Sequence, residues 1–284
     1  MPDPLLSVVI PVRNGARSLP ALLAALSSQT VGRDGFEVVV VDNGSRDGSG
    51  HIARSAGASV VSEPRRGRAL ARNRGVAAAS ASLIAFTDAD CVPAPGWLEA
   101  LLGCLRRSPI VAGAVELSTG KPPNRWERLE LLWRFAQRHS VEQGWGATAN
   151  LGVRRQAFSD VGGFDPSFRL IGEDVDFCLR AGAAGHAIGF CEEARVAHRA
   201  EASLSAIVRR AFVHGYSSNQ HAHRWPGKVG WQYWRHPRPM VAGDWALRRF
   251  GALAVQQRDL LAPARLEYTG EVFGSLWAEL RRAR

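Results

Sequence analysis

The sequence lacks long apolar runs. The longest, such as residues 38–41 and 83–86, are far shorter than the roughly 20 residues needed to span a bilayer. The N-terminus carries Asp3 and no basic region, so no signal peptide is predicted. The four cysteines form no CxxC pair, and without a secretion signal we expect reduced, mostly buried thiols. Lysine is also scarce, since Lys121 and Lys228 are the only lysines among 36 basic residues.

The overall composition is that of a globular protein. Hydrophobic residues make up 46% and charged residues 22% of the 284 residues, which excludes wholesale disorder, collagen-like repeats and small disulfide scaffolds. The length suits one large domain, or one domain with an appended piece. The net charge of +10 favours an anionic partner, such as nucleic acid, a membrane surface or a phosphorylated small molecule. Genome composition is an equally good explanation for most of the arginines.

Short apolar runs alternate with helical patterns over the first 118 residues. The runs predict buried strands at residues 6–12, 36–41, 58–62, 83–87 and 110–117. Ser18 is positioned to cap a helix with a leucine stripe, and further helices are predicted at residues 50–56, 69–79 and 97–106. Continuous apolar strands alternating with helices indicate a parallel sheet that is covered on both faces.

The rest of the chain is less regular. Asn124 and Glu127 resemble a capping box at the start of a helix, and residues 174–181 predict a short helix. Residues 144–150 and 162–173 are glycine-rich and predict loops. A helical stripe begins at Leu204, and two amphipathic helices are expected near residues 244–256 and 266–282.

Acidic residues end two of the predicted strands. Asp42 follows one strand, and Asp88 and Asp90 follow another in the run TDAD. In an open α/β sheet, ligands bind outside the carboxyl ends of the strands. Two carboxylates at positions i and i+2 can hold one hard divalent cation, whose coordination shell is completed by water and substrate phosphates. The pair therefore suggests a metal–diphosphate site.

Several motifs in order make a more specific pattern. Residues 8–14, VVVVDNGSRDGS, GRALARNRG, FTDADCVP, GGFDPSF, the Glu173–Asp174 pair and VAHR follow one another over residues 6–199. In these motifs the chain resembles the family 2 glycosyltransferases. The resemblance implies an α/β fold of the Rossmann-like GT-A type, with a mostly parallel central sheet and an α-helical C-terminal extension. It places a glycosyltransferase domain at residues 1–200, with a nucleotide-sugar part (1–118) and an acceptor-side part (119–200), and the extension at 201–284.

The resemblance also implies a donor site. Asp42 and the turn before it would form the nucleobase pocket, where a carboxylate can accept the ring N–H of uracil and so favours a UDP-sugar. Guanidinium groups of the basic segment suit phosphate and ribose oxygens. Mn²⁺ or Mg²⁺ would be held by Asp90 and His198, with Asp88 at the metal or the ribose. The implied donor-binding residues are Pro11, Val12, Arg13, Asn14, Asp42, Arg68, Arg72, Asn73, Asp88, Ala89 and Asp90.

The Glu173–Asp174 pair matches the catalytic carboxylates of the family. In an inverting transfer, a base removes the proton of the acceptor hydroxyl that attacks the anomeric carbon. We expect Asp174 to be this base, with Glu173 as the alternative. The chain departs from many members in having Asn43 after Asp42 where they carry a second acid. It also has no QxxRW-type run, which favours the transfer of one sugar at a time over processive synthesis.

A non-catalytic alternative is a basic protein that binds nucleic acid or a membrane surface, because Trp and Arg are frequent in residues 224–240. No nucleic-acid motif accompanies them, so a nucleic-acid partner is not expected. The expected partners are a nucleotide-sugar donor and an unidentified hydroxyl acceptor, whether a glycan, a lipid-linked molecule or a small molecule. Peripheral contact with the inner face of the membrane and a homodimer stay open. The predicted location is cytoplasmic.

Overall fold

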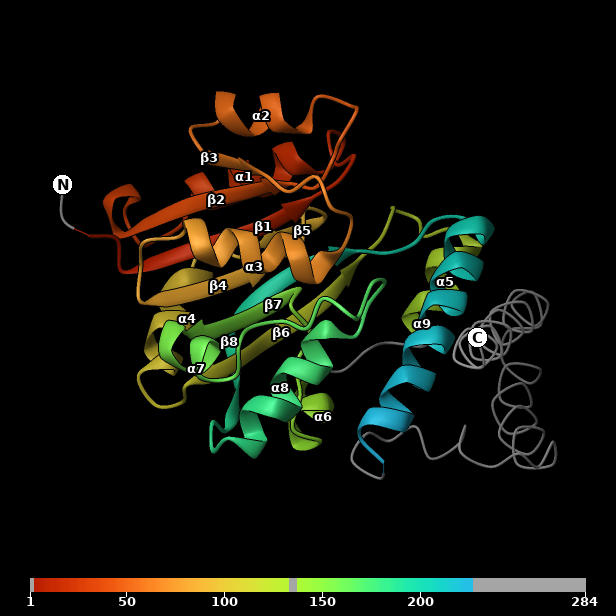
Figure 1. Cartoon of the computed structure of the whole chain (residues 1–284). Helices are drawn as coiled ribbons and strands as arrows, with labels where there is room; N and C mark the ends of the chain where they lie inside the picture. Colours follow the sequence, from red (N-terminus) through yellow and green to blue (C-terminus); the bar gives the residue numbers. More distant parts are fainter. Residues whose placement is uncertain (1–2, 133–136, 227–284) are drawn as a thin grey trace. The chain divides into compact units, whose positions relative to one another are not determined.

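The computed structural model describes residues 3–132 and 137–226 (Figure 1). The strands form one sheet in the order β3-β2-β1-β4-β7-β6-β8-β5. Their bounds are β1 Leu6–Val12, β2 Phe36–Asp42, β3 Ser59–Ser62, β4 Leu83–Thr87, β5 Cys91–Pro93, β6 Ile110–Ser118, β7 Asn150–Arg154 and β8 Ile188–Arg199. Helices lie between the strands, so the α/β class predicted from the sequence is confirmed.

One half of the sheet is parallel and the other half is not. Strand β1 pairs in parallel with β2 and β4, and β2 pairs in parallel with β3. Strand β7 is antiparallel to β4 and β6, and β5 is antiparallel to β8. The prediction of parallel strands is therefore confirmed for the half of the sheet that β1 to β4 form. Strands β5, β7 and β8 are not predicted from the sequence, because two are short and β8 carries many polar residues.

Helices cover both faces of the sheet. Their bounds are α1 Leu19–Ser27, α2 Ser49–Ser55, α3 Arg68–Ala78, α4 Trp97–Leu105, α5 Arg125–Leu132, α6 Gln137–Glu142, α7 Arg155–Asp160, α8 Glu173–Ala183 and α9 Leu204–Arg224. Successive residues of a strand point to opposite faces. Val8 and Ile10 of β1 accordingly pack with α1 and α4, whereas Val9 packs with α3, α7 and α8. Both faces are apolar, as expected for a covered sheet.

Four phenylalanines fasten α8 to the sheet. Phe86 of β4, Phe158 of α7, Phe177 of α8 and Phe164, which precedes α8, form five ring pairs with centroids 5.0–6.1 Å apart. Such pairs add to the stabilisation from burial alone. Because Phe86 lies two residues before Asp88, and Phe177 lies shortly after Glu173, the cluster fixes the helix that carries one acidic group relative to the strand that carries the other.

The two helix starts predicted from side-chain caps have different outcomes. Asn124 Oδ1 accepts the amide N–H groups of Trp126 and Glu127, at 2.8 and 3.0 Å, and the Glu127 carboxylate accepts the Asn124 amide at 2.8 Å. This confirms the capping box. Ser18 lies at the N-cap position of α1, but its hydroxyl donates to the Gly15 carbonyl at 3.3 Å and caps no helix amide. The predicted cap is wrong because the preceding turn offers a nearer acceptor.

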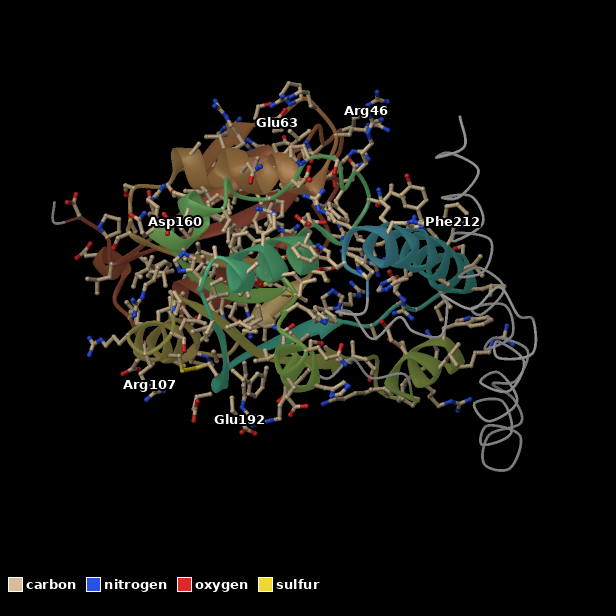
Figure 2. The ribbon with its side chains drawn as sticks, turned by 60° about the horizontal axis from the view of Figure 1, so that its bottom comes forward. Arg46, Glu63, Arg107, Asp160, Glu192 and Phe212 are labelled. Atoms are coloured by element: carbon tan, nitrogen blue, oxygen red, sulfur yellow. A yellow bond between two sulfur atoms is a disulfide. The ribbon has the colours of Figure 1, made fainter. Side chains whose placement is uncertain are left out.

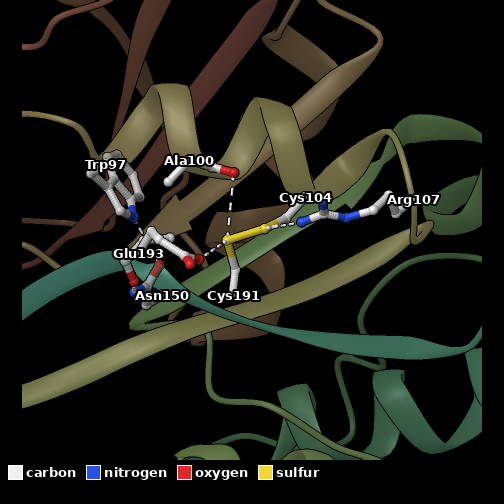
Figure 3. The surroundings of a disulfide bond; sticks show 8 residues. Trp97, Ala100, Cys104, Arg107, Asn150, Cys191 and Glu193 are labelled. Carbon is white, nitrogen blue, oxygen red and sulfur yellow. Dashed lines mark hydrogen bonds between the residues drawn. A yellow bond between two sulfur atoms is a disulfide. The ribbon is translucent and has the colours of Figure 1, made fainter.

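The cysteines correct a second expectation. Cys104 of α4 and Cys191 of β8 form a disulfide across 87 residues of sequence (Figure 3). Cys91 and Cys178 are free and buried, as expected. The pairing could not be predicted because it follows from the packing of α4 on β8, which no spacing motif signals.

The chain divides into two compact units. The first, residues 1–117, 135–169 and 173–199, holds the sheet. The second comprises residues 118–134, 170–172 and 200–284, and its described helices are α5 and α9. The domain boundaries predicted from the sequence stay a prediction. The two predicted tail helices lie outside the described residues. Across the part of the chain that the structure describes, no helix combines the length and apolarity that crossing a membrane requires.

Candidate active site

The two aspartates of the TDAD run lie at the carboxyl end of β4. Asp88 is half-buried and Asp90 is exposed. The antiparallel pairing of β5 with β8 sets Cys91 opposite His198. As a result, Asp90 Oδ1 and His198 Nε2 are 3.6 Å apart. Oxygen, nitrogen and sulfur ligand atoms of Asp90, His198 and Cys91 all lie within 4.8 Å of one another, close enough to hold one ion.

Burial and charged neighbours shift the pKa values of the acidic residues at this edge of the sheet. Although 47% of the Asp90 side chain is exposed, the partial loss of water around it and the neighbouring Asp88 carboxylate raise its pKa, and His198 opposes the shift. Burial alone would also raise the pKa of Asp88, but Arg72, Arg68 and His198 hold it below its ordinary value. Burial raises the pKa of the Cys91 thiol well above its usual range.

A buried arginine joins Asp88 to Glu173, the acid that begins α8. Arg72 of α3 has a side chain only 1% exposed, and its Nη2 donates to Asp88 Oδ1 at 2.7 Å. Its Nη1 makes an ion pair with Glu173 Oε1 at the start of α8, and Glu173 is 2% exposed. Burial disfavours the charge of Arg72, yet the carboxylates of Asp88, Glu173 and Asp174 raise its pKa. The guanidinium therefore stays charged and spans the two groups.

Glu173 is held in an environment that disfavours its ionised form. Burial raises the pKa of Glu173 to about 7, the Asp174 carboxylate adds to the shift, and Arg72 opposes it. Its Oε2 atom and Arg72 Nε are buried without a hydrogen-bond partner. The location of Glu173 in the first turn of α8, where the helix dipole favours negative charge, offsets part of the cost.

Asp174 is more accessible and differently bonded. It is half-buried, and its Oδ2 accepts the amide of Thr148 at 3.2 Å and the Thr148 hydroxyl at 3.4 Å. Its Oδ1 accepts the Val175 amide at 2.9 Å. Donors at both oxygens fix the carboxylate in one orientation.

A further acidic residue, Asp42, lies where β1 and β2 end. The strand register sets Val12 beside Asp42. Asp42 Oδ1 accepts the Ser45 amide at 2.8 Å, and Asn14 adopts a left-handed conformation (φ 55°) in the facing turn. Asn14 Oδ1 accepts the amide of Arg46, at 2.9 Å, and Figure 2 shows the Arg46 side chain at the surface. The structure thus brings the predicted pocket residues 11–14 and Asp42 together.

Asn43, the residue after Asp42, is bonded to the segment that leads into α3. Its Nδ2 donates to the carbonyls of Glu63 and Arg65, both at 2.7 Å, and its Oδ1 accepts the Gly67 amide at 3.1 Å. The side-chain amide therefore fixes the basic loop that leads into α3, and it requires both donor and acceptor atoms.

These observations agree with comparisons to known proteins. A family model described as "Glycosyl transferase family 2" matches residues 7–162. The chain belongs to glycosyl transferase family 2. Glycosyltransferase AglE of Haloferax volcanii is 33% identical over 218 residues, which cover 74% of this chain and 71% of AglE. The pre-mycofactocin glycosyltransferase of Mycobacterium tuberculosis is 35% identical over 237 residues, which cover 78% of this chain and 48% of that protein. This chain is therefore a glycosyltransferase.

Solved structures support the fold of this glycosyltransferase. The mannosyltransferase PcManGT from Pyrobaculum calidifontis, solved in complex with GDP-Man and Mn²⁺, aligns with a TM-score of 0.66 and 20% identity. That alignment covers 97% of this chain and 88% of PcManGT. TarS of S. aureus aligns with a TM-score of 0.56 and 17% identity, over 95% of this chain and 54% of TarS. The likeness confirms the predicted GT-A type of fold.

The remaining predicted residues of the glycosyltransferase lie around these groups. Arg68 begins α3, is exposed, and lowers the pKa of Asp88 through its charge. Asn73 is on the same helix, and its amide pairs with the backbone N–H and C=O of Phe164 at 3.0 and 2.8 Å. Ala89 packs on the apolar core beside β4. The donor-binding and metal-binding roles of all these residues stay predictions.

Sequence reasoning misses two features of the site. Thr148 gives no signal because it lies in a glycine-rich stretch without a recognisable motif, yet it bonds Asp174 by two donors. Arg72 is predicted to bind donor phosphate or ribose, but both of its terminal nitrogens are bonded to carboxylates. Its position on the buried face of α3 could have raised this second interpretation, because it follows Ala69 by three residues.

Proposed function

We propose that this glycosyltransferase moves one sugar from a nucleotide-sugar donor to an acceptor hydroxyl with inversion at the anomeric carbon. The observation that carries the proposal is the Arg72 bridge, which couples Asp88 of the TDAD run to the acid pair that begins α8. A single displacement needs a donor-side group and an acceptor-side base held at a fixed separation. Family membership favours this catalytic function over the alternative of a basic binding protein.

Asp174 is the general base in this proposal. The acceptor oxygen forms a bond to the anomeric carbon while the bond from that carbon to the diphosphate oxygen breaks. The hydroxyl proton passes to Asp174, and the nucleoside diphosphate leaves with the bonding electron pair. Asp174 suits this role better than Glu173, because Glu173 is buried and paired with Arg72, whereas Asp174 is partly accessible and oriented by Thr148.

Asp90 and His198, whose ligand atoms lie close enough to share one ion, would be the direct ligands of a divalent cation, with Asp88 beside them at the metal or the ribose. Carboxylates with one imidazole suit Mn²⁺ better than Mg²⁺, which prefers oxygen ligands alone. When bound, such a cation neutralises charge on the leaving diphosphate. Arg72 keeps Asp88 ionised and oriented for that role.

The preferred donor in this proposal is a UDP-sugar. Asp42 lies next to the turn 11–14 and can accept the ring N–H of uracil while its Oδ1 stays bonded to Ser45. Guanine also offers ring N–H donors, and PcManGT was solved with GDP-Man. GDP-mannose is therefore the second donor to be tested. The acceptor class, contact with a membrane surface and dimer formation are separate predictions from the sequence.

The test is release of nucleotide from a panel of UDP-, GDP- and dTDP-sugars with Mn²⁺, with Mg²⁺ and with excess EDTA. We expect release from one donor class, stimulated by Mn²⁺ and abolished by EDTA. Asp90→Ala should lose the metal-dependent release, whereas Asp160→Ala, an acid of α7 outside this site, is the matched control. Full activity in EDTA would contradict the metal site. A product that keeps the anomeric configuration of the donor would contradict single displacement.

A further inference from the structure

The loop between α6 and β7 contacts the acid that we propose as the base. Thr148 lies in this loop and is 2% exposed. Its amide and its hydroxyl both donate to Oδ2 of Asp174, at 3.2 and 3.4 Å. Both residues belong to the first compact unit of the chain. A single residue of the same unit therefore supplies both of the donors that Oδ2 receives.

The two oxygens of Asp174 are left with different capacities. A carboxylate oxygen has about two lone pairs for hydrogen bonds. Oδ2 receives two donors from Thr148, whereas Oδ1 receives the amide of Val175, at 2.9 Å. Among the residues that the structure describes, no second donor reaches Oδ1, which therefore keeps one lone pair. That lone pair is available to accept a proton from an attacking hydroxyl.

The backbone on either side of Thr148 is anchored by buried side chains. Oε1 of Gln137, which is 2% exposed, accepts the Ala147 amide at 3.0 Å. Nε2 of Gln137 donates to two further backbone carbonyls, at 2.9 and 3.0 Å. On the other side, the buried hydroxyl of Thr87 donates to the Ala149 carbonyl at 3.0 Å. These bonds fix the backbone that presents the two donors to the carboxylate.

One of these anchors connects the loop to the donor side of the site. Thr87 is the last residue of β4 and directly precedes Asp88. The pairing of β4 with β7 also sets Thr87 beside Asn150. The loop that carries Thr148 is therefore tied to the strand that leads into Asp88, by a connection separate from the Arg72 bridge. A transfer between two held groups loses rate when one of them shifts.

We propose that Thr148 is a positioning residue for sugar transfer: its hydroxyl occupies the second lone pair of Asp174 Oδ2 and so leaves Oδ1 to take the proton of the acceptor hydroxyl. This inference rests on the proposed function, in which Asp174 is the base. Thr148 acts through Asp174 and contacts neither donor nor acceptor. As the acceptor oxygen bonds to the anomeric carbon, the diphosphate leaves with its electron pair and the proton ends on Oδ1.

The test removes the hydroxyl while keeping the shape of the side chain. Thr148→Val keeps the branched side chain and the backbone amide, whereas Thr148→Ser keeps the hydroxyl. Thr30→Val is the matched control, because the hydroxyl of the exposed Thr30 also donates to a carboxylate, Glu99 Oε2, at 2.9 Å. Each variant is assayed for nucleotide release with water as the acceptor, using the nucleotide-sugar that the wild-type protein cleaves. Nucleotide binding counts the folded sites.

We expect Thr148→Val to lower kcat by about 10-fold, because the backbone amide stays and a displacement of about 1 Å can cost about 100-fold. The donor KM and the nucleotide Kd should change by less than about twofold. Thr148→Ser should recover most of the loss, and Thr30→Val should match the wild type. In an Asp174→Asn background, Thr148→Val should cost less than about twofold more, because the base that it positions is already removed. If Thr148→Val does not fold, Thr148→Ala carries the same comparison.

Four results would overturn the inference: wild-type kcat in Thr148→Val, a loss confined to the donor KM, equal losses in the Val and Ser variants, or an undiminished loss in the Asp174→Asn background. Each of them leaves the proposed function intact. If Asp174→Asn itself turns over at the wild-type rate, the assignment of the base fails. If the wild-type protein releases no nucleotide from any donor, the proposed function fails. In both of these cases the role of Thr148 falls as well.

Discussion

Replacing Arg72 by methionine is the most direct test of how the site is held together. Methionine keeps an unbranched apolar stem and removes the guanidinium. Asp88 and Glu173 would then face a site without the positive charge that both contact. Removing one partner of a buried ion pair costs about 3–5 kcal/mol, because the remaining charge is left uncompensated. Glu173 can take up a proton, since its pKa is already about 7, so we expect a loss near 3 kcal/mol.

The assay is urea unfolding followed by circular dichroism at pH 7.5. Arg74→Met, at an exposed position of the same helix, is the control and should change the free energy of unfolding by less than about 0.5 kcal/mol. Combining Arg72→Met with Glu173→Gln should restore part of the loss, with a coupling energy of about 1–3 kcal/mol. If Arg72→Met costs no more than Arg74→Met, or if the coupling is near zero, the bridge does not stabilise the site.

Three further predictions concern the base, the buried acid and the disulfide. Asp174→Asn should lower kcat by about 10²–10⁴-fold while nucleotide affinity, measured by calorimetry, stays unchanged; near wild-type turnover would move the base to Glu173. For Glu173, folding raises the pKa from 4.5 to about 7, so the folded protein binds more protons than the unfolded chain between these values. Stability should fall as pH rises through this window, by on the order of 3 kcal/mol, and Glu173→Gln should flatten the dependence in pH-resolved melts. Reducing the Cys104–Cys191 disulfide, which spans 87 residues, should lower the free energy of unfolding by about 4–5 kcal/mol and Tm by about 10 °C. The Tm of a Cys104→Ser/Cys191→Ser variant should not respond to the reductant. A wild-type Tm that is unchanged by the reductant would refute the prediction.

Local sequence patterns are sufficient to predict the strands in the first half of the sheet. The apolar runs of β1, β2 and β4 predict buried strands, and the rule that ligands bind at strand carboxyl ends points to Asp42 and Asp88. The capping box at Asn124 is likewise a local feature, since donor and acceptor are three residues apart.

Contacts between distant segments could not be predicted. Arg72 and Glu173 are 101 residues apart, and nothing in either sequence neighbourhood shows that they meet. Cys104 and Cys191 meet only because α4 packs on β8. Strand β8 alternates too weakly to be recognised, because Glu192, Glu193 and Arg195 interrupt its apolar residues. In each case the decisive information is tertiary packing, which periodicity does not carry.

The hydrogen bonds of the Asn43 side-chain amide affect how readily this residue deamidates during storage, because Gly44 follows it. An asparagine followed by glycine is the sequence most prone to deamidation, because the glycine amide meets little hindrance when it attacks the side-chain carbonyl. Conversion to aspartate would replace the Nδ2 donor by an oxygen facing the Glu63 and Arg65 carbonyls, and would release the basic loop. In the folded protein the same three hydrogen bonds restrain the amide and oppose the attack. Chemical ageing at this position should therefore occur mainly during excursions to the unfolded state, so that storage conditions which favour folding also preserve the loop.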